Sequence, residues 1–362
     1  MKNEFWPLRP ALHPVYARLL CAEMRRRGFA QDAILAGTRL DWQRLHEDNG
    51  FLSFEAMRRL IEHCLQLSQC PWLGIDVGFQ TQASAHGALG AAMIASRNLS
   101  DALRLIQRFS GLRQQMAVIH FKFDTDFHVE LEELVALGDI REYLLGQLVA
   151  GLSQLLTTLT GRELQSALRI EWPFPQPPWA AHYQRLAGVN TFDAPCLRMH
   201  IEAELLASPS LAADEETQQR AVRDCELQLQ RLQAGGSLSQ RVRVQLASSE
   251  VMMPSLEAMA ALENMSARTF IRRLALEQQR YQHLLDEVRE ERACWLLRQT
   301  ELSIEAIAGR LGYVDTSNFS RTFKRWLGQT PRQFRQQARL AFGSNAHEDS
   351  HEAASFGMIR QA

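Results

Sequence analysis

The chain has 362 residues, of which 46% are hydrophobic, and its formal net charge at pH 7 is −1. This length favours two domains, and the apolar content is sufficient for a hydrophobic core. The six cysteines lack C-x-x-C spacing and the N-terminus lacks the apolar run of a secretion signal. We therefore expect a cytoplasmic protein and exclude a disulfide-rich secreted domain.

The first distinctive pattern along the chain predicts a β-hairpin. Apolar and polar residues alternate in AVIHFKF and FHVEL, and Asp124-Thr125-Asp126 lies between the two stretches. The hairpin contains His120, Asp124, Asp126 and His128, which have side chains able to bind a metal ion. Residues near a turn are usually solvated, so we expect no metal site here.

A segment without charged residues follows at 143–161. It approaches the length of a membrane span, but Gln, Ser and Thr residues interrupt it and its leucines recur at helical spacing. We therefore predict a core helix and no contact with a membrane. The later segment 171–179 contains four prolines, which exclude a regular helix and favour a loop or a sheet edge.

A domain boundary is predicted beyond the middle of the chain. Gly235 and Gly236 follow a long polar helical pattern over Glu215–Gln233 and would end that helix. Helical patterns surround the hairpin before these glycines, and only helical patterns follow them. The predicted organisation is an α+β domain at residues 1–235, an all-α domain at 236–342 and a disordered tail at 343–362.

The second domain contains a repeated helical module. SLEAMA at residues 255–260 recurs as SIEAIA at residues 303–308. Each copy is followed by a residue that tolerates positive φ, Asn264 or Gly312, and then by a second helix that begins with a capping residue. Both copies therefore predict a helix, a tight turn and a helix, and the second turn is one residue longer.

The outer face of each second helix carries residue types that bind DNA bases and phosphates. These residues are Arg268, Arg272 and Arg273 in the first copy, and Thr316, Ser317, Asn318, Ser320, Arg321, Lys324 and Arg325 in the second. Residues 254–340 contain 14 Lys and Arg against 10 Asp and Glu, a balance of +4, which leaves −5 for the remainder. This asymmetry favours a polyanionic partner, although a solvated helix face has the same composition.

A helical pattern over residues 281–298 joins the two copies. Its 18 residues at ~1.5 Å each give a length of roughly 27 Å. One turn of B-DNA is of similar size, about 34 Å, so two helices at the ends of this spacer would enter successive major grooves of double-stranded DNA. The alternative is a pair of packed helical hairpins without a ligand.

The run LSIEAIAGRLGYVDTSNFSRTFKRWLGQTPRQFR, residues 302–335, resembles the signature of AraC/XylS-type transcription regulators. The similarity extends back through YQHLLDEVREERA at residues 281–293. It implies two helix-turn-helix units joined by a long helix, binding to promoter DNA, and RNA polymerase as a partner. The base-facing positions implied by the family are Arg268, Ile271, Arg272, Thr316, Ser317 and Arg321. Glu263 departs from the family pattern, which usually has an apolar residue there.

The N-terminal domain resembles, less specifically, the arabinose-binding-like sensor domain of one branch of this family. The similar segments are LGIDVG, LGAAMIASRNLSDALRLIQRF, YQRLAGVNTFDAP and AELLASPSLAAD. Such domains bind a small effector or form dimers. We therefore predict an activator controlled by a small molecule. The alternative is a ligand-independent regulator, or a repressor, whose N-terminal domain serves only for oligomerisation.

No motif identifies the effector site. The apolar helix at residues 144–159 and the aromatic side chains of Trp172, Phe174 and Trp179 suit an apolar or amphipathic ligand, but we favour the interpretation of each side chain as part of the core. The ligand class stays open between a lipid-like compound and a small polar metabolite such as an amino acid or a sugar. We predict no cofactor and no enzymatic activity, because the chain has no G-x-S-x-G, phosphate-loop or dinucleotide motif and Cys196 lacks the nearby histidine of a repair methyltransferase.

Overall fold

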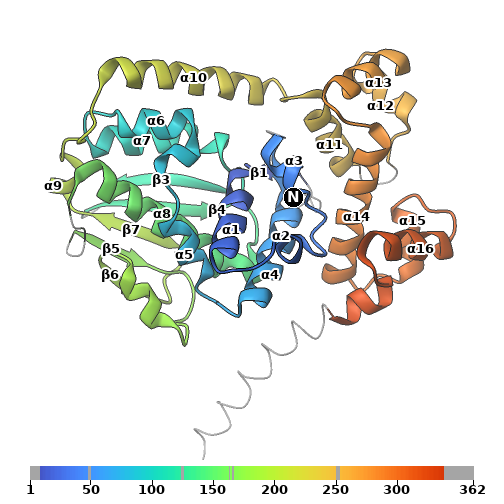
Figure 1. The fold of residues 1–362 in the computed structure, drawn as a ribbon, viewed down its shortest axis with the longest axis horizontal. Coiled ribbons are helices and arrows are strands. Elements are labelled where there is room, and N and C mark those ends of the chain that lie inside the picture. The colour runs from blue at the N-terminus through green and yellow to red at the C-terminus, as the bar shows by residue number, and fades with distance from the viewer. Residues whose placement is uncertain are drawn as a thin grey trace, which may run out of the picture. The chain divides into compact units, whose positions relative to one another are not determined.

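The computed structural model describes residues 9–337 except 48–49, 124–125, 163, 165–166 and 250–252. These residues belong to two compact units, Arg9–Gln240 and a second that begins at Arg241, both drawn in Figure 1. The predicted boundary after residue 235 precedes this division by a few residues. The predicted disordered tail, residues 343–362, lies outside the described residues.

The first unit combines helices and strands, as predicted. Its strands are β1 (Pro10–Leu12), β2 (Leu52–Ser53), β3 (Ala117–Phe123), β4 (Phe127–Glu133), β5 (Leu168–Glu171), β6 (Val189–Thr191) and β7 (Leu197–Ile201). Its α-helices are α1 (Val15–Arg26), α2 (Gln31–Leu35), α3 (Trp42–Glu47), α4 (Phe54–Ser68), α5 (Leu73–Phe79), α6 (Ala88–Ile94), α7 (Leu99–Phe109), α8 (Arg141–Thr160), α9 (Ala203–Leu206) and α10 (Glu215–Gln233). Short 3-10 helices are η2 (Ala83–His86), η3 (Ser110–Leu112), η4 (Gly138–Ile140) and η5 (Ala180–Arg185).

Five of the strands form one sheet in the order β3-β4-β7-β5-β6. β3 and β4 are the predicted hairpin, with Ala117 opposite Glu133, and β5 and β6 are the parallel pair. Because side chains alternate along a strand, Leu131 of β4 lies on the buried face of the sheet, whereas Glu130 lies on the other face. Residues 172–179 form neither helix nor strand, as the prolines predicted.

α8 contains the segment without charged residues and is a core helix, as predicted. No described helix is long and apolar enough to cross a membrane. α5 packs directly against α8, and two glycines allow this approach. A Cβ added to Gly74 would lie 2.1 Å from the Tyr143 carbonyl oxygen, and one added to Gly78 would lie 2.6 Å from the Gln147 carbonyl oxygen. The glycines of LGIDVG are therefore required by close helix packing.

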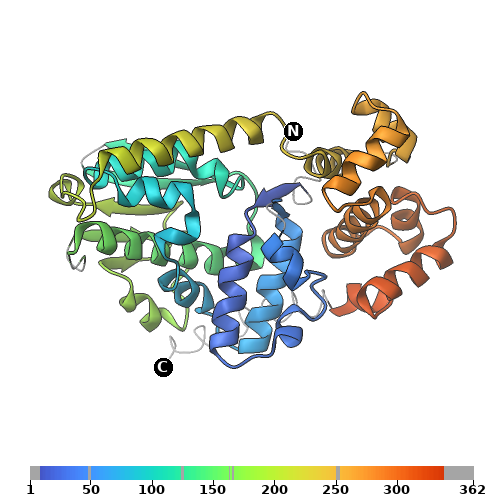
Figure 2. The same cartoon turned by 45° about the horizontal axis from the view of Figure 1, so that its top comes forward.

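α10 has the bounds that the sequence predicted and ends before Gly235 and Gly236, whose φ angles are 92° and 67°. The helix packs against α6 and η3, and Figure 2 shows it running along α6. Arg108 at the end of α7 pairs with Glu226 of α10 at 2.6 Å. These contacts attach α10 to the part of the first unit that contains α6, α7 and η3.

Helices joined by turns and short loops make up the described residues of the second unit. Its helices are α11 (Leu238–Ser248, shared with the first unit), α12 (Leu256–Leu262), α13 (Ala267–Leu276), α14 (Tyr281–Gln299), α15 (Ile304–Arg310) and α16 (Thr316–Leu327). α14 joins the α12–α13 pair to the α15–α16 pair (Figure 1). A core cluster gathers buried side chains from α14, α15 and α16, including Leu297, Ile307 and Phe319.

Candidate nucleic-acid interface and sensor cavity

The first helix-turn-helix unit consists of α12 and α13. The Ser255 hydroxyl accepts a hydrogen bond from the Ala258 amide and begins α12, and Ser266 does the same for α13 through the Thr269 amide. Between them, Asn264 adopts the predicted left-handed conformation with φ 56°. Phe270 of α13 is fully buried, so the opposite face of this helix is directed outward.

The second unit, α15 and α16, repeats this construction. Ser303 caps α15, and the Asp315 carboxylate accepts from the Ser317 amide at 2.8 Å to begin α16. Gly312 has φ 80°, and the turn from residue 311 to 315 is one residue longer than the turn from 263 to 266, as predicted. Phe319 and Phe323 are buried on the inner face of α16.

Residues of α14 contact both units. The Tyr281 hydroxyl donates to the Pro254 carbonyl oxygen just before α12. Near the other unit, Arg289 donates from Nε to the Leu311 carbonyl oxygen at 3.1 Å, and its guanidinium lies 5.4 Å from the centre of the Tyr313 ring. α14 is therefore fixed to the turn of the second unit as well as to the start of the first.

The predicted DNA-contacting residues lie together on the outer faces of α13 and α16. Most of them are exposed and two, Thr316 and Ser320, are half-buried; the exposed ones are Arg268, Ile271, Arg272, Arg273, Ser317, Asn318, Arg321, Lys324 and Arg325. Within the described part of the chain, none of the six cations among them forms an ion pair. This set of six is called the recognition cations below. Their charge is available to an anionic partner.

Two interactions in the second unit were not foreseen from the sequence. Arg292 of α14 is fully buried and donates to the carbonyl oxygens of Ser249 at 2.7 Å and Ala247 at 3.1 Å, which caps the end of α11. Glu263, the residue that departs from the family pattern, accepts from Arg241 of α11 at 2.7 and 2.9 Å. An ion pair therefore occupies the place of the usual apolar contact.

Both parts of the chain are similar to domains of known transcription regulators. Residues 28–210 match the family model for the arabinose-binding domain of AraC transcription regulators, and residues 259–337 match a helix-turn-helix domain. The ornithine utilization regulator of Pseudomonas aeruginosa is 31% identical over 324 residues, which are 89% of this chain and 95% of that protein. The chain belongs to the AraC family of transcription regulators. It is a DNA-binding regulator with an arabinose-binding-like sensor domain.

Two further proteins are similar to this chain over most of its length. The transcriptional regulator VqsM of P. aeruginosa is 25% identical over 279 residues, covering 72% of this chain and 83% of that protein. The crystal structure of the regulator CdpR from the same species covers 89% of this chain and 98% of its own at 23% identity, with a TM-score of 0.46. Members of the AraC family are regulators rather than enzymes.

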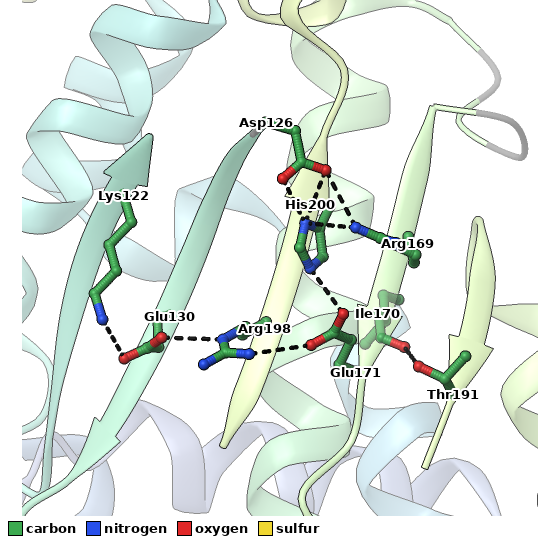
Figure 3. Close-up of polar contacts among 9 residues, drawn as sticks. All are labelled: Lys122, Asp126, Glu130, Arg169, Ile170, Glu171, Thr191, Arg198 and His200. Carbon is green, nitrogen blue, oxygen red and sulfur yellow. Dashed lines mark hydrogen bonds and ion pairs between the residues drawn. The ribbon is translucent and has the colours of Figure 1, made fainter. Parts of the chain in front are cut away.

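The polar face of the sensor sheet carries a chain of ion pairs across β3, β4, β7 and β5 (Figure 3). The Glu130 carboxylate forms ion pairs with Lys122 at 2.7 Å and with Arg198 at 3.0 Å. Arg198 also approaches Glu171, which accepts from His200 at 3.0 Å. No sequence pattern predicted this series of ion pairs, because β5 and β7 lie far from the hairpin of β3 and β4 in the sequence.

The same face shows what the candidate metal ligands do. Asp126 and His128 lie beside His200, and one donor atom of each falls within 4.8 Å of the others. The Arg169 guanidinium, however, contacts both Asp126 at 3.2 Å and His200 at 3.0 Å (Figure 3), and its charge opposes a cation there. His120 pairs with Glu132 at 2.8 Å, and Asp124 lies outside the described residues. Ion pairing is the role that the contacts support.

The opposite, apolar face of β3 and β4 borders a partly open cavity of about 160 Å³, which α6, α7 and α8 also line. Five leucines of the predicted core helix line it: Leu144, Leu145, Leu148, Leu152 and Leu155. Trp172, Phe174 and Trp179 do not. Trp172 is fully buried and packs edge-on against Tyr183, in agreement with the favoured interpretation of these side chains as part of the core.

Proposed function

We propose that α13 and α16 are recognition helices that enter successive major grooves on one side of a DNA duplex. The observation that carries this proposal is the set of recognition cations on two helices joined by α14. With 19 residues at ~1.5 Å each, α14 is about 28 Å long, which approaches the ~34 Å turn of B-DNA. The family assignment supports DNA as the partner.

Roles follow from residue chemistry and position on the two helices. We assign base edges to Arg268, Ile271 and Arg272 of α13 and to Thr316, Ser317 and Arg321 of α16. We assign phosphates to Lys324 and Arg325, with Arg273, Asn318 and Ser320 completing the surface. Arginine suits base edges because its planar fork can make two hydrogen bonds to guanine, whereas lysine offers a mobile point charge that suits phosphate.

A pair of variants on α16 tests these roles. Arg321→Ala should lose ~1–3 kcal/mol of discrimination at one base position and so relax selectivity. Lys324→Gln should weaken binding to all sequences alike and reduce the slope of log K against log salt by about 1. Arg310→Ala, at an exposed position of α15, is the control and should change neither. Gel shifts on operator fragments and on their point variants measure both quantities; unchanged selectivity in Arg321→Ala would refute its assignment.

We further propose that the first unit senses a small molecule and controls DNA binding or dimerisation through Gly235 and Gly236. In this proposal the protein is a cytoplasmic activator that acts with RNA polymerase. The match over residues 28–210 and the apolar cavity support a sensor. A promoter–reporter assay separates activation from repression, and sedimentation with and without ligand tests the dimer. A ligand-independent regulator would show the same reporter output and mass in both conditions.

The name of the P. aeruginosa relative connects that protein with ornithine utilization. The cavity of this chain does not suit ornithine as a ligand. The described residues that line the cavity include no carboxylate, so none of them can pair with the two ammonium groups of ornithine.

A further inference from the structure

The sensor cavity contains one full positive charge and no negative charge among the described residues that line it. The charge belongs to Arg113, which follows η3 and is only 8% exposed. One of its NH2 groups donates to the His86 carbonyl oxygen. Its Nε has no hydrogen-bond partner in the described part of the chain, and no described carboxylate pairs with it. A buried guanidinium in this state would gain strongly from an anion.

Two further residues that line the cavity each carry a buried polar atom without a partner among the described residues, Nε2 of Gln147 and Nδ1 of His86. Burial, assisted by the charge of Arg113, lowers the pKa of His86 to about 4, so this imidazole is neutral at pH 7. Burial also lowers the pKa of Arg113, but a guanidinium stays protonated in this range. Arg113 therefore supplies the positive charge, and Gln147 supplies a neutral donor.

The remaining wall is almost entirely hydrocarbon. Representative lining residues are Leu103, Ile106, Ile119, Leu131, Leu148 and Leu155. A cavity of about 150 Å³ is known to hold benzene, so a volume of about 160 Å³ suits an apolar body of roughly six to ten carbon atoms. The wall excludes a polyhydroxylated ligand such as a sugar, because several hydroxyl groups would be buried without partners.

We propose that this cavity binds a medium-chain monocarboxylate, whose carboxylate pairs with Arg113 and whose hydrocarbon body lies against β3, β4 and α8. The inference rests on the sensor function proposed above and gives it a ligand class. It also gives a route to the linker. Arg113 directly follows η3, η3 packs against α10, and α10 ends just before Gly235 and Gly236. A ligand that moves Arg113 therefore acts beside the helix that leads to the linker.

Calorimetry and thermal unfolding of the full chain test the proposal, with octanoate, 1-octanol and octylamine as probes of equal chain length. A ligand that binds only the native state raises the melting temperature. We expect octanoate to bind at least tenfold more tightly than 1-octanol, and octylamine not to bind. Equal binding of octanoate and 1-octanol, or no binding of octanoate at millimolar concentration, would overturn the proposal.

Substitutions test whether Arg113 supplies the positive charge that binds the carboxylate. Arg113→Met should reduce octanoate affinity at least tenfold and leave 1-octanol affinity unchanged, whereas Arg104→Met, at an exposed position on α7, should change neither. Leu152→Trp should weaken both probes by filling the cavity. If Arg113→Met fails to fold, the comparison of the three probes on the unaltered protein still decides the matter. Octanoate binding that survives Arg113→Met would refute the role of this residue.

Different results would refute the proposed DNA-binding function and the proposed ligand class. A chain that shifts operator DNA but does not bind octanoate would refute the ligand class and leave the DNA-binding assignment intact. A chain that binds octanoate with the Arg113 dependence described, but selects no DNA fragment, would refute the proposed function and leave the cavity assignment intact.

Discussion

The close packing of α5 on α8 makes a quantitative prediction for Gly78→Ala. The new Cβ would lie 2.5 Å from the Ala150 Cβ and 2.6 Å from the Gln147 carbonyl oxygen, and a backbone atom cannot be moved by a change of rotamer. Overpacking of this kind costs about 1–3 kcal/mol, and we take the upper end because the main chain must shift. Replacing a helical glycine by alanine returns about 1 kcal/mol. The net loss should be about 1–2 kcal/mol.

Gly151→Ala is the matched control on the facing helix. Its added Cβ would meet nothing closer than 3.7 Å, an ordinary contact, so only the gain in helix propensity remains and the variant should be as stable as the parent or more so. Urea unfolding of each full-length variant, monitored by circular dichroism, gives the midpoint at which its first unit unfolds. If Gly78→Ala were as stable as the parent, or Gly151→Ala equally damaging, the packing argument would be wrong.

Two further predictions concern buried or paired charges. Arg292→Leu removes the donors to the Ser249 and Ala247 carbonyl oxygens and should cost about 2–3 kcal/mol in thermal unfolding, whereas Arg310→Leu on the surface should change stability by less than about 0.5 kcal/mol. Lys122, with Arg198, lowers the pKa of Glu130 from 4.5 to about 2. Because the folded pKa is the lower one, this carboxylate stabilises the fold above pH 4.5 and loses its contribution as the pH falls toward 2. Glu130→Gln should therefore cost about 1–2 kcal/mol at pH 7, after allowance for the partly exposed Lys122, and almost nothing near pH 2; equal losses at both would contradict this.

The sequence predicted the helix-turn-helix units well because their signals are local. A capping residue, Ser266 or Asp315, lies within about two helical turns of both the residue with positive φ and the inward phenylalanine of its unit. Asn264, Gly312 and Phe319 therefore adopt the predicted conformations and burial. The hairpin of β3 and β4 was predictable for the same reason, since its alternation and its turn are adjacent in the sequence.

Features that depend on distant contacts were not predictable. His200 joins Asp126 only because β7 pairs with β4, and Glu263 meets Arg241 only because α11 packs beside the first helix-turn-helix unit. Arg113 stands in an ordinary polar stretch, and nothing nearby in the sequence shows that it is buried without a carboxylate. The sequence left open which apolar side chains line a pocket; in the structure α8 lines the cavity, whereas Trp172 belongs to the core.

The single spacer α14 has a consequence for the geometry of the DNA site. The two modules differ in sequence and lie at opposite ends of one helix, so they cannot exchange places. In the proposed binding mode, the DNA site for one chain is therefore directional and not palindromic. In the proposed binding mode, reversing the site at a promoter would reverse the order of the two modules relative to RNA polymerase, the proposed partner. Inserting about five base pairs between the two contacted segments would rotate them to opposite sides of the duplex, where one helical spacer cannot serve both.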